Sequence, residues 1–271
     1  MHNQPALDLS RVFQLEPHGP DTYLAESPHY PWGRIYGGLV IAQALWAATQ
    51  TVRTEHSVHS LHAYFILGGE FAEPVRYEVD RVRNGRSFTT RRVIARQSAG
   101  AILTLECSFQ RYEEGAESQP LEMPAGVPAP EALPKVYDAG LDRREVTADG
   151  RAQPGSLVWG RFPLPLGEDS RLHYCALAYL SDMNAMDAIS NSRAGGPPES
   201  SGPPSEGGMG ASLDHAVWFH RPVRADDWLL MDMTGHGLIR TRGLATGHVF
   251  DRTGVHVATI AQEGLLRAKR A

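Results

Sequence analysis

Three short motifs in the second half of the sequence together supply a carboxylate, a hydroxyl and an amide. They are Ser181–Asn184 (SDMN), Ser212–His215 (SLDH) and Ala261–Gly264 (AQEG). A carboxylate can take a proton from water, whereas a hydroxyl and an amide can both donate and accept hydrogen bonds and so orient that water. If the fold brings the motifs together, they can hold and activate one water molecule.

Asp182 is the strongest candidate for the base. The pattern of residues 172–189 predicts one helix, and the neighbours of Asp182 on its face are almost all apolar: Ala178, Tyr179, Ala185 and Met186. Asp187 has mainly polar neighbours, which suits a solvated side of the helix. Apolar surroundings raise the pKa of a carboxyl group toward the value that a base needs near neutral pH. A buried aspartate with a purely structural role is an equally open interpretation.

Gln262 and Ser212 are the groups expected to orient the water. Alternation along the strand that begins near Val255 places Gln262 on an apolar face, where an ordinary cross-strand hydrogen bond is the alternative role. Ser212 lacks a GxSxG motif, and alternation places His215 on the opposite strand face, so a nucleophilic role is disfavoured. Asp214 shares the face of Ser212 and is the second candidate for the base.

Composition favours small-molecule chemistry. The chain has 26 basic and 31 acidic residues and a net charge of -5, which gives no electrostatic reason to expect a nucleic-acid or membrane partner. Its apolar runs fall short of the roughly 20 residues of a membrane-spanning helix. Cys107 and Cys175 lie in apolar runs without a CxxC motif or a secretory leader, so we expect reduced thiols and a cytoplasmic location.

Three histidines in the first half invite a metal-site interpretation. His56, His59 and His62 are spaced by three residues, which alternates them between the faces of a strand, and no HExxH or Cys/His spacing accompanies them. We therefore expect no metal site.

The order of elements repeats. A helix over residues 38–53 precedes a series of strands, and the helix over residues 172–189 is followed by strands near 212–219, 228–234, 238–250 and 255–266. Such modules, in which an antiparallel sheet wraps a long helix, predict an α+β fold of the double hotdog type.

The predicted domains are residues 1–115, a Pro-rich linker over 116–154, and residues 155–271, which carry the candidate catalytic residues. A Gly/Pro/Ser-rich stretch from Gly195 to Gly210 is predicted to be a loop.

Five separated motifs resemble the TesB-like, or type II, acyl-CoA thioesterases. They occur in the expected order across both halves: Tyr36–Ala44, His59–Phe65, Asn84–Phe88, Trp218–Pro222 and Gln262–Gly264. The resemblance implies a double hotdog fold and hydrolysis of acyl-CoA without a metal or organic cofactor. Members of this family use an aspartate, a threonine or serine, and a glutamine to activate water.

Residue by residue, the family roles fall on Asp182, Ser212 and Gln262 rather than on Asp214. The implied reaction is attack of the activated water on the thioester carbonyl, with a backbone N–H such as that of Gly38 as a candidate donor to the substrate oxyanion. Gly38 is equally explained by close helix packing. The chain departs from the family in having Ser212 where Thr is commoner, and in the long loop after Asp182.

Two other functions are weighed against hydrolysis. A non-catalytic acyl-CoA binding module would keep the pocket without turnover. An enoyl-CoA hydratase on the same fold would need an Asp and a His within one helical segment, and Asp182 has no histidine after it in its helix. We expect either a homodimer or a homotetramer, because exposed sheet edges favour further assembly.

Overall fold

The computed structural model describes residues 8–138, 141–146, 154–193 and 208–268. Among these residues, the first half contains one helix, α1 (Gly37–Thr49), and six strands: β1 (Glu16–Pro17), β2 (Thr22–Ala25), β3 (His56–Phe65), β4 (Val75–Asn84), β5 (Phe88–Gln97) and β6 (Gly100–Arg111). The described part of the second half has two α-helices, α2 (Ser170–Ser181) and α3 (Ala185–Asn191), and strands β9 (Gly155–Arg161), β10 (Gly208–Ser212), β11 (Asp214–Phe219), β12 (Leu229–Ile239), β13 (Arg242–Asp251) and β14 (His256–Ala268).

The main strands form one antiparallel sheet with internal symmetry. Its order includes β4-β5-β6-β3 followed by β11-β14-β13-β12, so the second set mirrors the first about the β3–β11 junction. At that junction β3 and β11 are antiparallel, with Val217 opposite Leu61. The repeat of a helix and four strands is thus present twice within one continuous sheet, which confirms the α+β double hotdog architecture predicted from the sequence.

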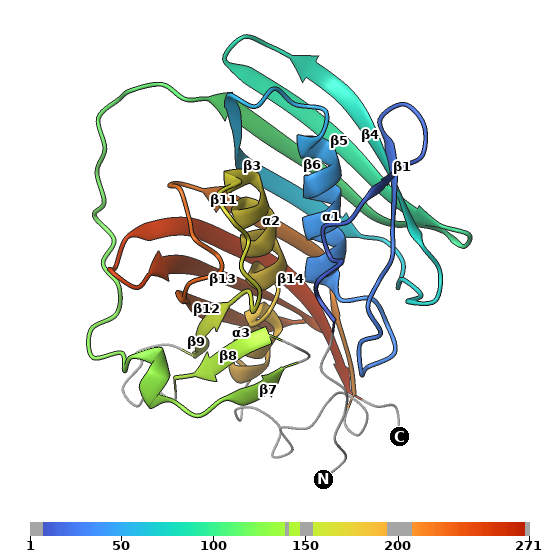
Figure 1. Ribbon diagram of the computed structural model, residues 1–271. Helices are drawn as coiled ribbons and strands as arrows, with labels where there is room; N and C mark the ends of the chain where they lie inside the picture. The colour runs from blue at the N-terminus through green and yellow to red at the C-terminus, as the bar shows by residue number, and fades with distance from the viewer. Residues whose placement is uncertain (1–7, 139–140, 147–153, 194–207, 269–271) are drawn as a thin grey trace.

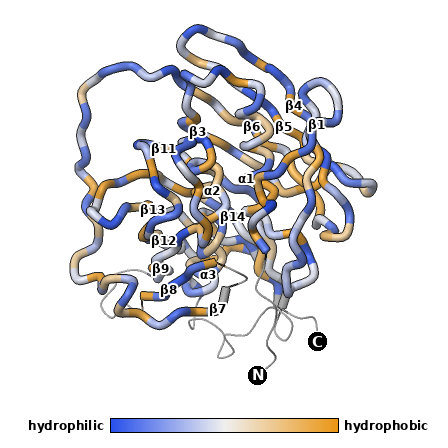
Figure 2. The backbone as a smooth tube through the Cα atoms, viewed as in Figure 1, coloured by the Kyte–Doolittle hydropathy of each residue, from blue (hydrophilic) through white to orange (hydrophobic). Residues whose placement is uncertain are grey.

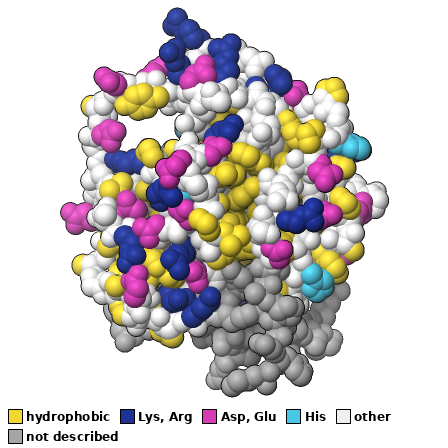
Figure 3. Space-filling view, in the orientation of Figure 1, with side chains coloured by type: hydrophobic (Ala, Val, Ile, Leu, Met, Phe, Trp, Pro, Cys, Tyr) yellow, Lys and Arg dark blue, Asp and Glu magenta, His cyan; other side chains and the backbone are white. Residues whose placement is uncertain are grey.

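The two long helices lie side by side against the curved sheet, α1 in blue and α2 in yellow (Figure 1). Both helices are buried along most of their length, and a single apolar cluster includes residues from both halves of the chain. Hydrophobic residues follow these central elements in Figure 2, and apolar side chains gather in the middle of the same face in Figure 3. No helix among the described residues has the length and apolar character to span a membrane.

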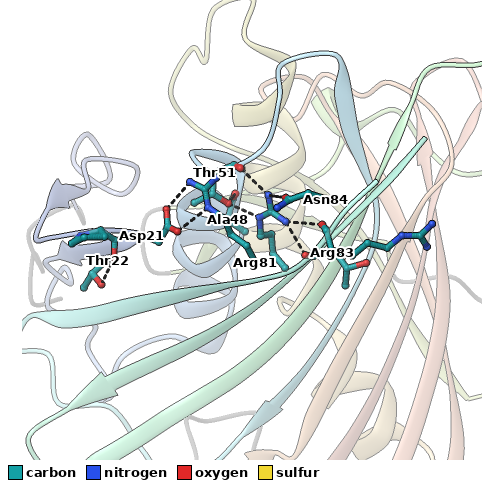
Figure 4. A network of polar contacts seen from close by, with 10 residues as sticks. Asp21, Thr22, Ala48, Thr51, Arg81, Arg83 and Asn84 are labelled. Carbon is teal, nitrogen blue, oxygen red and sulfur yellow. Dashed lines mark hydrogen bonds and ion pairs between the residues drawn. The ribbon is translucent and has the colours of Figure 1, made fainter. Parts of the chain in front are cut away.

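The first helix is closed at its C-terminal end by a buried arginine. Arg91 is only 1% exposed and donates from Nε to the Thr51 hydroxyl at 2.6 Å and from Nη2 to the Thr51 carbonyl at 2.9 Å. Its other hydrogen bonds go to Asn84 Oδ1 and to the carbonyls of Arg83 and Thr90. Figure 4 labels three of the residues that supply these acceptors, Thr51, Arg83 and Asn84. A cation at a helix C-terminus complements the helix dipole, so Arg91 ties α1 to the first half of the sheet.

The stretch predicted as a linker contains regular structure. A short 3-10 helix, η1 (Pro130–Ala132), is followed by strands β7 (Val136–Asp138) and β8 (Leu141–Glu145), and β8 pairs with β9. Before them, the chain crosses the outside of the molecule, and Trp159 donates to the carbonyl of Pro128 at 2.9 Å. Both strands follow Pro134, and together they form one edge of the sheet.

The single helix predicted over residues 172–189 is two helices. α2 ends at Ser181, Asp182 is its C-terminal cap, and α3 begins at Ala185. Ser, Asp and Asn compete for backbone hydrogen bonds and favour helix ends, which explains a break within Ser-Asp-Met-Asn. Of the loop predicted from Gly195 to Gly210, residues 195–207 lie outside the described residues and the last three open β10.

Candidate active site

The end of α2 places Asp182 against the first turn of α1. The backbone N–H of Gly38 donates to Asp182 Oδ2 at 2.9 Å. A Cβ atom on Gly37 would lie 2.7 Å from that same oxygen, and one on Gly38 would lie 2.3 Å from the carbonyl oxygen of Tyr179. The two glycines therefore let the helices approach closely enough for a carboxylate on one to cap the other.

Ser212 and Gln262 reach the same carboxylate from neighbouring strands. Gln262 Nε2 donates to Ser212 Oγ at 2.7 Å, and the Gln262 amide also hydrogen bonds to Asp182. Ser212 Oγ lies 3.5 Å from Asp182 Oδ1. The structure thus brings together the three residues that the sequence analysis singled out, with Oδ2 of Asp182 held by backbone and Oδ1 turned toward the hydroxyl.

Burial dominates the electrostatics of Asp182. Removal from water raises the pKa of its carboxyl group to about 7, against the opposing effect of hydrogen bonds from Gln262, Gly38 and Ser212. A carboxylate with such a pKa is present in its basic form near neutral pH and is a much stronger base than an exposed aspartate. Asp187 instead lies half-exposed and pairs with Arg143 Nη2 at 2.6 Å.

His215 joins this group, contrary to the prediction from strand alternation. Its Nδ1 lies 2.5 Å from Gln262 Oε1, and its Nε2 lies 2.7 Å from Ser181 Oγ. The reason is a bulge. Ser212 at the end of β10 pairs with Gly264, and Ala216 in β11 pairs with Ala261. Four positions along β10 and β11 therefore correspond to only three positions along β14. The extra residue reverses the alternation between β10 and β11, which turns His215 inward.

Sequence reasoning missed His215 as a partner of Gln262, and it also missed Ser181. The signal was present in the first and second motifs, which contain both residues, but the bulge that unites them is not visible in a pattern of alternating residues. Asp214, the second candidate base, accepts a hydrogen bond from the backbone N–H of Glu263 at 2.6 Å. Its carboxylate therefore fixes the backbone of β14 beside Gln262.

Aromatic side chains surround the first turn of α1. Tyr36 donates from its hydroxyl to the carbonyl of Tyr179 at 3.1 Å, and the hydroxyls of Tyr30 and Tyr179 are 2.9 Å apart. Phe65, at the end of β3, lies close enough that a Cβ on Gly37 would come within 2.9 Å of its ring. The same Cβ would lie 2.7 Å from Asp182 Oδ2, so the Phe65 ring lies near this carboxylate and contributes to its desolvation.

The three histidines of β3 do not form a joint site. His59 Nε2 lies 2.8 Å from the Ser108 hydroxyl, and the ring of His62 packs edge-on against Trp218. His56 is buried at the start of the strand. Among the described residues, no group of three or more His, Cys, Asp or Glu side chains is arranged to hold a metal ion.

Comparison with known proteins gives matches over nearly the whole chain. Residues 26–110 match the family model described as the acyl-CoA thioesterase N-terminal domain, and residues 115–266 match that of the C-terminal domain. Acyl-coenzyme A thioesterase 8 of Mus musculus is 34% identical over 96% of this chain and 89% of its own length. Acyl-CoA thioesterase 2 of Haemophilus influenzae is 30% identical, covering 96% of this chain and 97% of that protein.

Solved structures agree. An acyl-CoA thioesterase II from Mycobacterium marinum is 35% identical, with a TM-score of 0.81 over 97% of this chain and 98% of that one. A hot dog fold protein from Alicyclobacillus acidocaldarius has a TM-score of 0.77 at 18% identity, covering 96% of this chain and 98% of that one, a similarity that concerns the fold alone.

Proposed function

The chain belongs to the acyl-CoA thioesterase family, whose members are thioester hydrolases, and we propose that it hydrolyses acyl-CoA with water activated by Asp182, Ser212 and Gln262. The observation that carries this assignment of residues is the buried carboxylate of Asp182. Its Oδ2 accepts from Gly38, while its Oδ1 faces the Ser212 hydroxyl at 3.5 Å. Oδ1 is therefore the oxygen available to take a proton.

A water molecule fits the chemistry of this arrangement. A contact of 3.5 Å between Ser212 Oγ and Oδ1 is a weak direct hydrogen bond, and a water bonded to both groups would give each a stronger partner. The Gln262 amide, 2.7 Å from Ser212 Oγ, limits the orientations of that hydroxyl. Two fixed polar groups and one base are the requirements for presenting a water lone pair to a carbonyl.

Hydrolysis proceeds in this proposal by attack of the activated water and departure of the CoA thiolate. Asp182 Oδ1 takes a proton from the water as the water oxygen bonds to the thioester carbonyl carbon, and the carbonyl becomes an oxyanion. The C–S bond then breaks, the carbonyl re-forms as the free acid, and the electron pair leaves with the CoA sulfur. The proton on Asp182 passes to the thiolate or to solvent, which restores the carboxylate.

Gly38 has a different part in this proposal from the one that its sequence position suggested. Its N–H already has Asp182 Oδ2 as an acceptor at 2.9 Å, so we assign it to holding the base rather than to binding the substrate oxyanion. The first turn of α1 also carries the positive end of the helix dipole, which favours the ionised form of a carboxylate placed there.

The experiment is release of free CoA from a series of acyl-CoA esters by the purified protein, followed with a thiol reagent. Turnover is expected for at least one chain length, and lower turnover is expected for Ser212→Ala than for Ser212→Thr, which keeps the hydroxyl. Tight binding of every ester without thiol release would favour the binding module. Addition of water to an enoyl-CoA with the thioester left intact would favour the hydratase.

Three finer assignments are also proposals. We propose a division into residues 1–115, 116–154 and 155–271, a cytoplasmic location, and a homodimer or homotetramer. Buried Cys107 and Cys175, which form no disulfide, support a reducing compartment.

Exposed Tyr64 and Trp218 near the β3–β11 junction support assembly through the outer face of the sheet. Light scattering on the purified protein tests the oligomeric state, and a monomeric mass would contradict it.

A further inference from the structure

His215 is a buried histidine whose ring nitrogens both have partners. It is 1% exposed, with Gln262 Oε1 at 2.5 Å from Nδ1 and Ser181 Oγ at 2.7 Å from Nε2. Neither contact is explained by the proposed water activation, which uses only the other end of the Gln262 amide. A series of hydrogen-bonded side chains therefore extends the site inward by two residues, from Ser212 and Gln262 to His215 and Ser181.

The carboxylate of Asp182 determines which group donates in each hydrogen bond of this series of side chains. Asp182 in its basic form can only accept, so the NH2 end of the Gln262 amide must face Asp182 and Ser212. The Gln262 oxygen then faces His215. Two acceptors do not approach to 2.5 Å, so Nδ1 of His215 must carry the proton and donate it to Oε1.

The other nitrogen of His215 is then a bare acceptor. In a neutral imidazole only one nitrogen carries hydrogen, so Nε2 must accept from the Ser181 hydroxyl at 2.7 Å. Burial lowers the pKa of His215 to about 4, which keeps the ring neutral at physiological pH. The carbonyl of Ala178 is the alternative acceptor for the Ser181 proton at 2.9 Å, but a proton placed there would leave Nε2 without a donor from Ser181.

We propose that His215 is a positioning residue: held in its Nδ1–H tautomer by Ser181, it fixes the amide of Gln262 so that the NH2 group faces Ser212 and Asp182. Rotation of that amide by half a turn would point its oxygen at the carboxylate and remove the donor to Ser212. His215 thus acts through Gln262 and touches neither the water nor the substrate. The inference rests on the proposed roles of Gln262 and Asp182.

Two substitutions of similar size separate hydrogen bonding from packing. In His215→Asn the amide nitrogen occupies the place of Nδ1 and keeps a donor to Gln262, whereas His215→Leu removes the donor and fills the space. We expect kcat for acyl-CoA hydrolysis to fall about 10- to 100-fold in His215→Leu, as for a misplaced reacting group, with KM within about twofold. His215→Asn should recover most of the loss.

Gln262→Ala is the reference variant. Because His215 acts through Gln262, adding His215→Leu to Gln262→Ala should lower kcat no further. A fully active His215→Leu, or losses that multiply in the double variant, would overturn the positioning role. If Gln262→Ala itself keeps wild-type kcat, the proposed function of Gln262 fails instead, whatever the His215 variants do.

A measurement on the unmodified protein keeps the test independent of variant folding. Nuclear magnetic resonance of protein labelled with 13C and 15N in histidine distinguishes the two neutral tautomers by their ring shifts. At neutral pH we expect His215 to be in the Nδ1–H form, and Ser181→Ala to increase the share of the Nε2–H form. An Nε2–H tautomer or an imidazolium ring in the wild-type protein would overturn the inference.

Discussion

The backbone N–H of Gly38 donates a hydrogen bond of 2.9 Å to Oδ2 of Asp182, across 144 positions of sequence. The donor lies in the first half of the chain and the acceptor in the second, so the candidate base is held at the contact between the halves. The close approach of the helices depends on the absence of side chains at Gly37 and Gly38. Geometry at this contact should therefore affect activity directly.

We expect Gly37→Ala to lower kcat, because the added methyl group displaces the carboxylate of Asp182. The added Cβ would lie 2.7 Å from Asp182 Oδ2 and 2.9 Å from the Phe65 ring, so the carboxylate must move. We expect kcat to fall at least about tenfold, because displacement of a catalytic group by about 1 Å has effects of that order or larger. Gly68→Ala is the matched control, because a Cβ there comes no closer than 3.7 Å to Arg34. Equal kcat for both variants would contradict the prediction.

Activity should rise with pH through the titration of Asp182. Its pKa of about 7 means that the basic form becomes dominant above that value, so kcat should increase on going from about pH 6 to about pH 8 and then level off. Measuring kcat at saturating substrate avoids the effect that titration of the substrate's phosphate groups has on binding of acyl-CoA. A kcat that stays constant across this range, in protein shown to remain folded, would count against Asp182 as the base.

The same buried carboxylate should cost stability at high pH. Its pKa is 3.8 when exposed and about 7 in the folded protein, so the folded state binds more protons between these values. The contribution of protonated Asp182 to the free energy of unfolding is therefore lost as pH rises from about 4 to about 7. The free energy of unfolding of Asp182→Asn, relative to that of wild type, should therefore rise by up to about 4 kcal/mol between about pH 4 and pH 8, since each pKa unit corresponds to about 1.4 kcal/mol.

Urea denaturation of wild type and Asp182→Asn at several pH values measures this difference. His215 contributes in the opposite direction, because its pKa falls from 6.5 to about 4 on folding and stability then increases as pH rises between those values. Both proteins contain His215, so its contribution cancels in the comparison. A difference between the two proteins that is independent of pH would show that Asp182 has an ordinary pKa.

Arg91 should matter for stability rather than for chemistry. Replacement by Met leaves the hydroxyl and the carbonyl oxygen of buried Thr51 without their donor, together with the partly buried acceptors at Asn84 and Arg83. We expect a loss of about 3 kcal/mol or more in the free energy of unfolding. The matched control is Arg92→Met, which removes an exposed ion pair with Asp80 and should change stability by less than about 1 kcal/mol. Similar losses in both variants would refute the role of Arg91.

The sequence predicts the architecture well because the apolar periods of helices and strands are strong local signals. It also singles out Asp182 and Gln262, which the structure places in contact, since each is a polar residue on an otherwise apolar face. It fails at His215, because one extra residue near Leu213 reverses alternation in a way that only pairing with β14 reveals. It also runs α2 and α3 together, because apolar residues at helical spacing continue on both sides of Ser181–Asn184 and hide the preference of Ser, Asp and Asn for helix ends.

The order of strands within the sheet lay beyond local patterns for a similar reason. Nothing in β3 or β11 alone indicates that they pair with one another, because the junction joins Leu61 to Val217 across more than half of the chain. Likewise the buried Arg91 resembles its exposed neighbour Arg92 in sequence, and only strand parity together with the end of α1 distinguishes them.

The most direct test of water activation by Asp182 is the kcat of Asp182→Asn beside that of Asp187→Asn. The two variants make the same chemical change five positions apart, one in the buried carboxylate and one in the half-exposed partner of Arg143. We expect Asp182→Asn to lower kcat at least about 100-fold with a folded structure and retained acyl-CoA binding, and Asp187→Asn to stay within about twofold of wild type. Wild-type turnover in folded Asp182→Asn would contradict it.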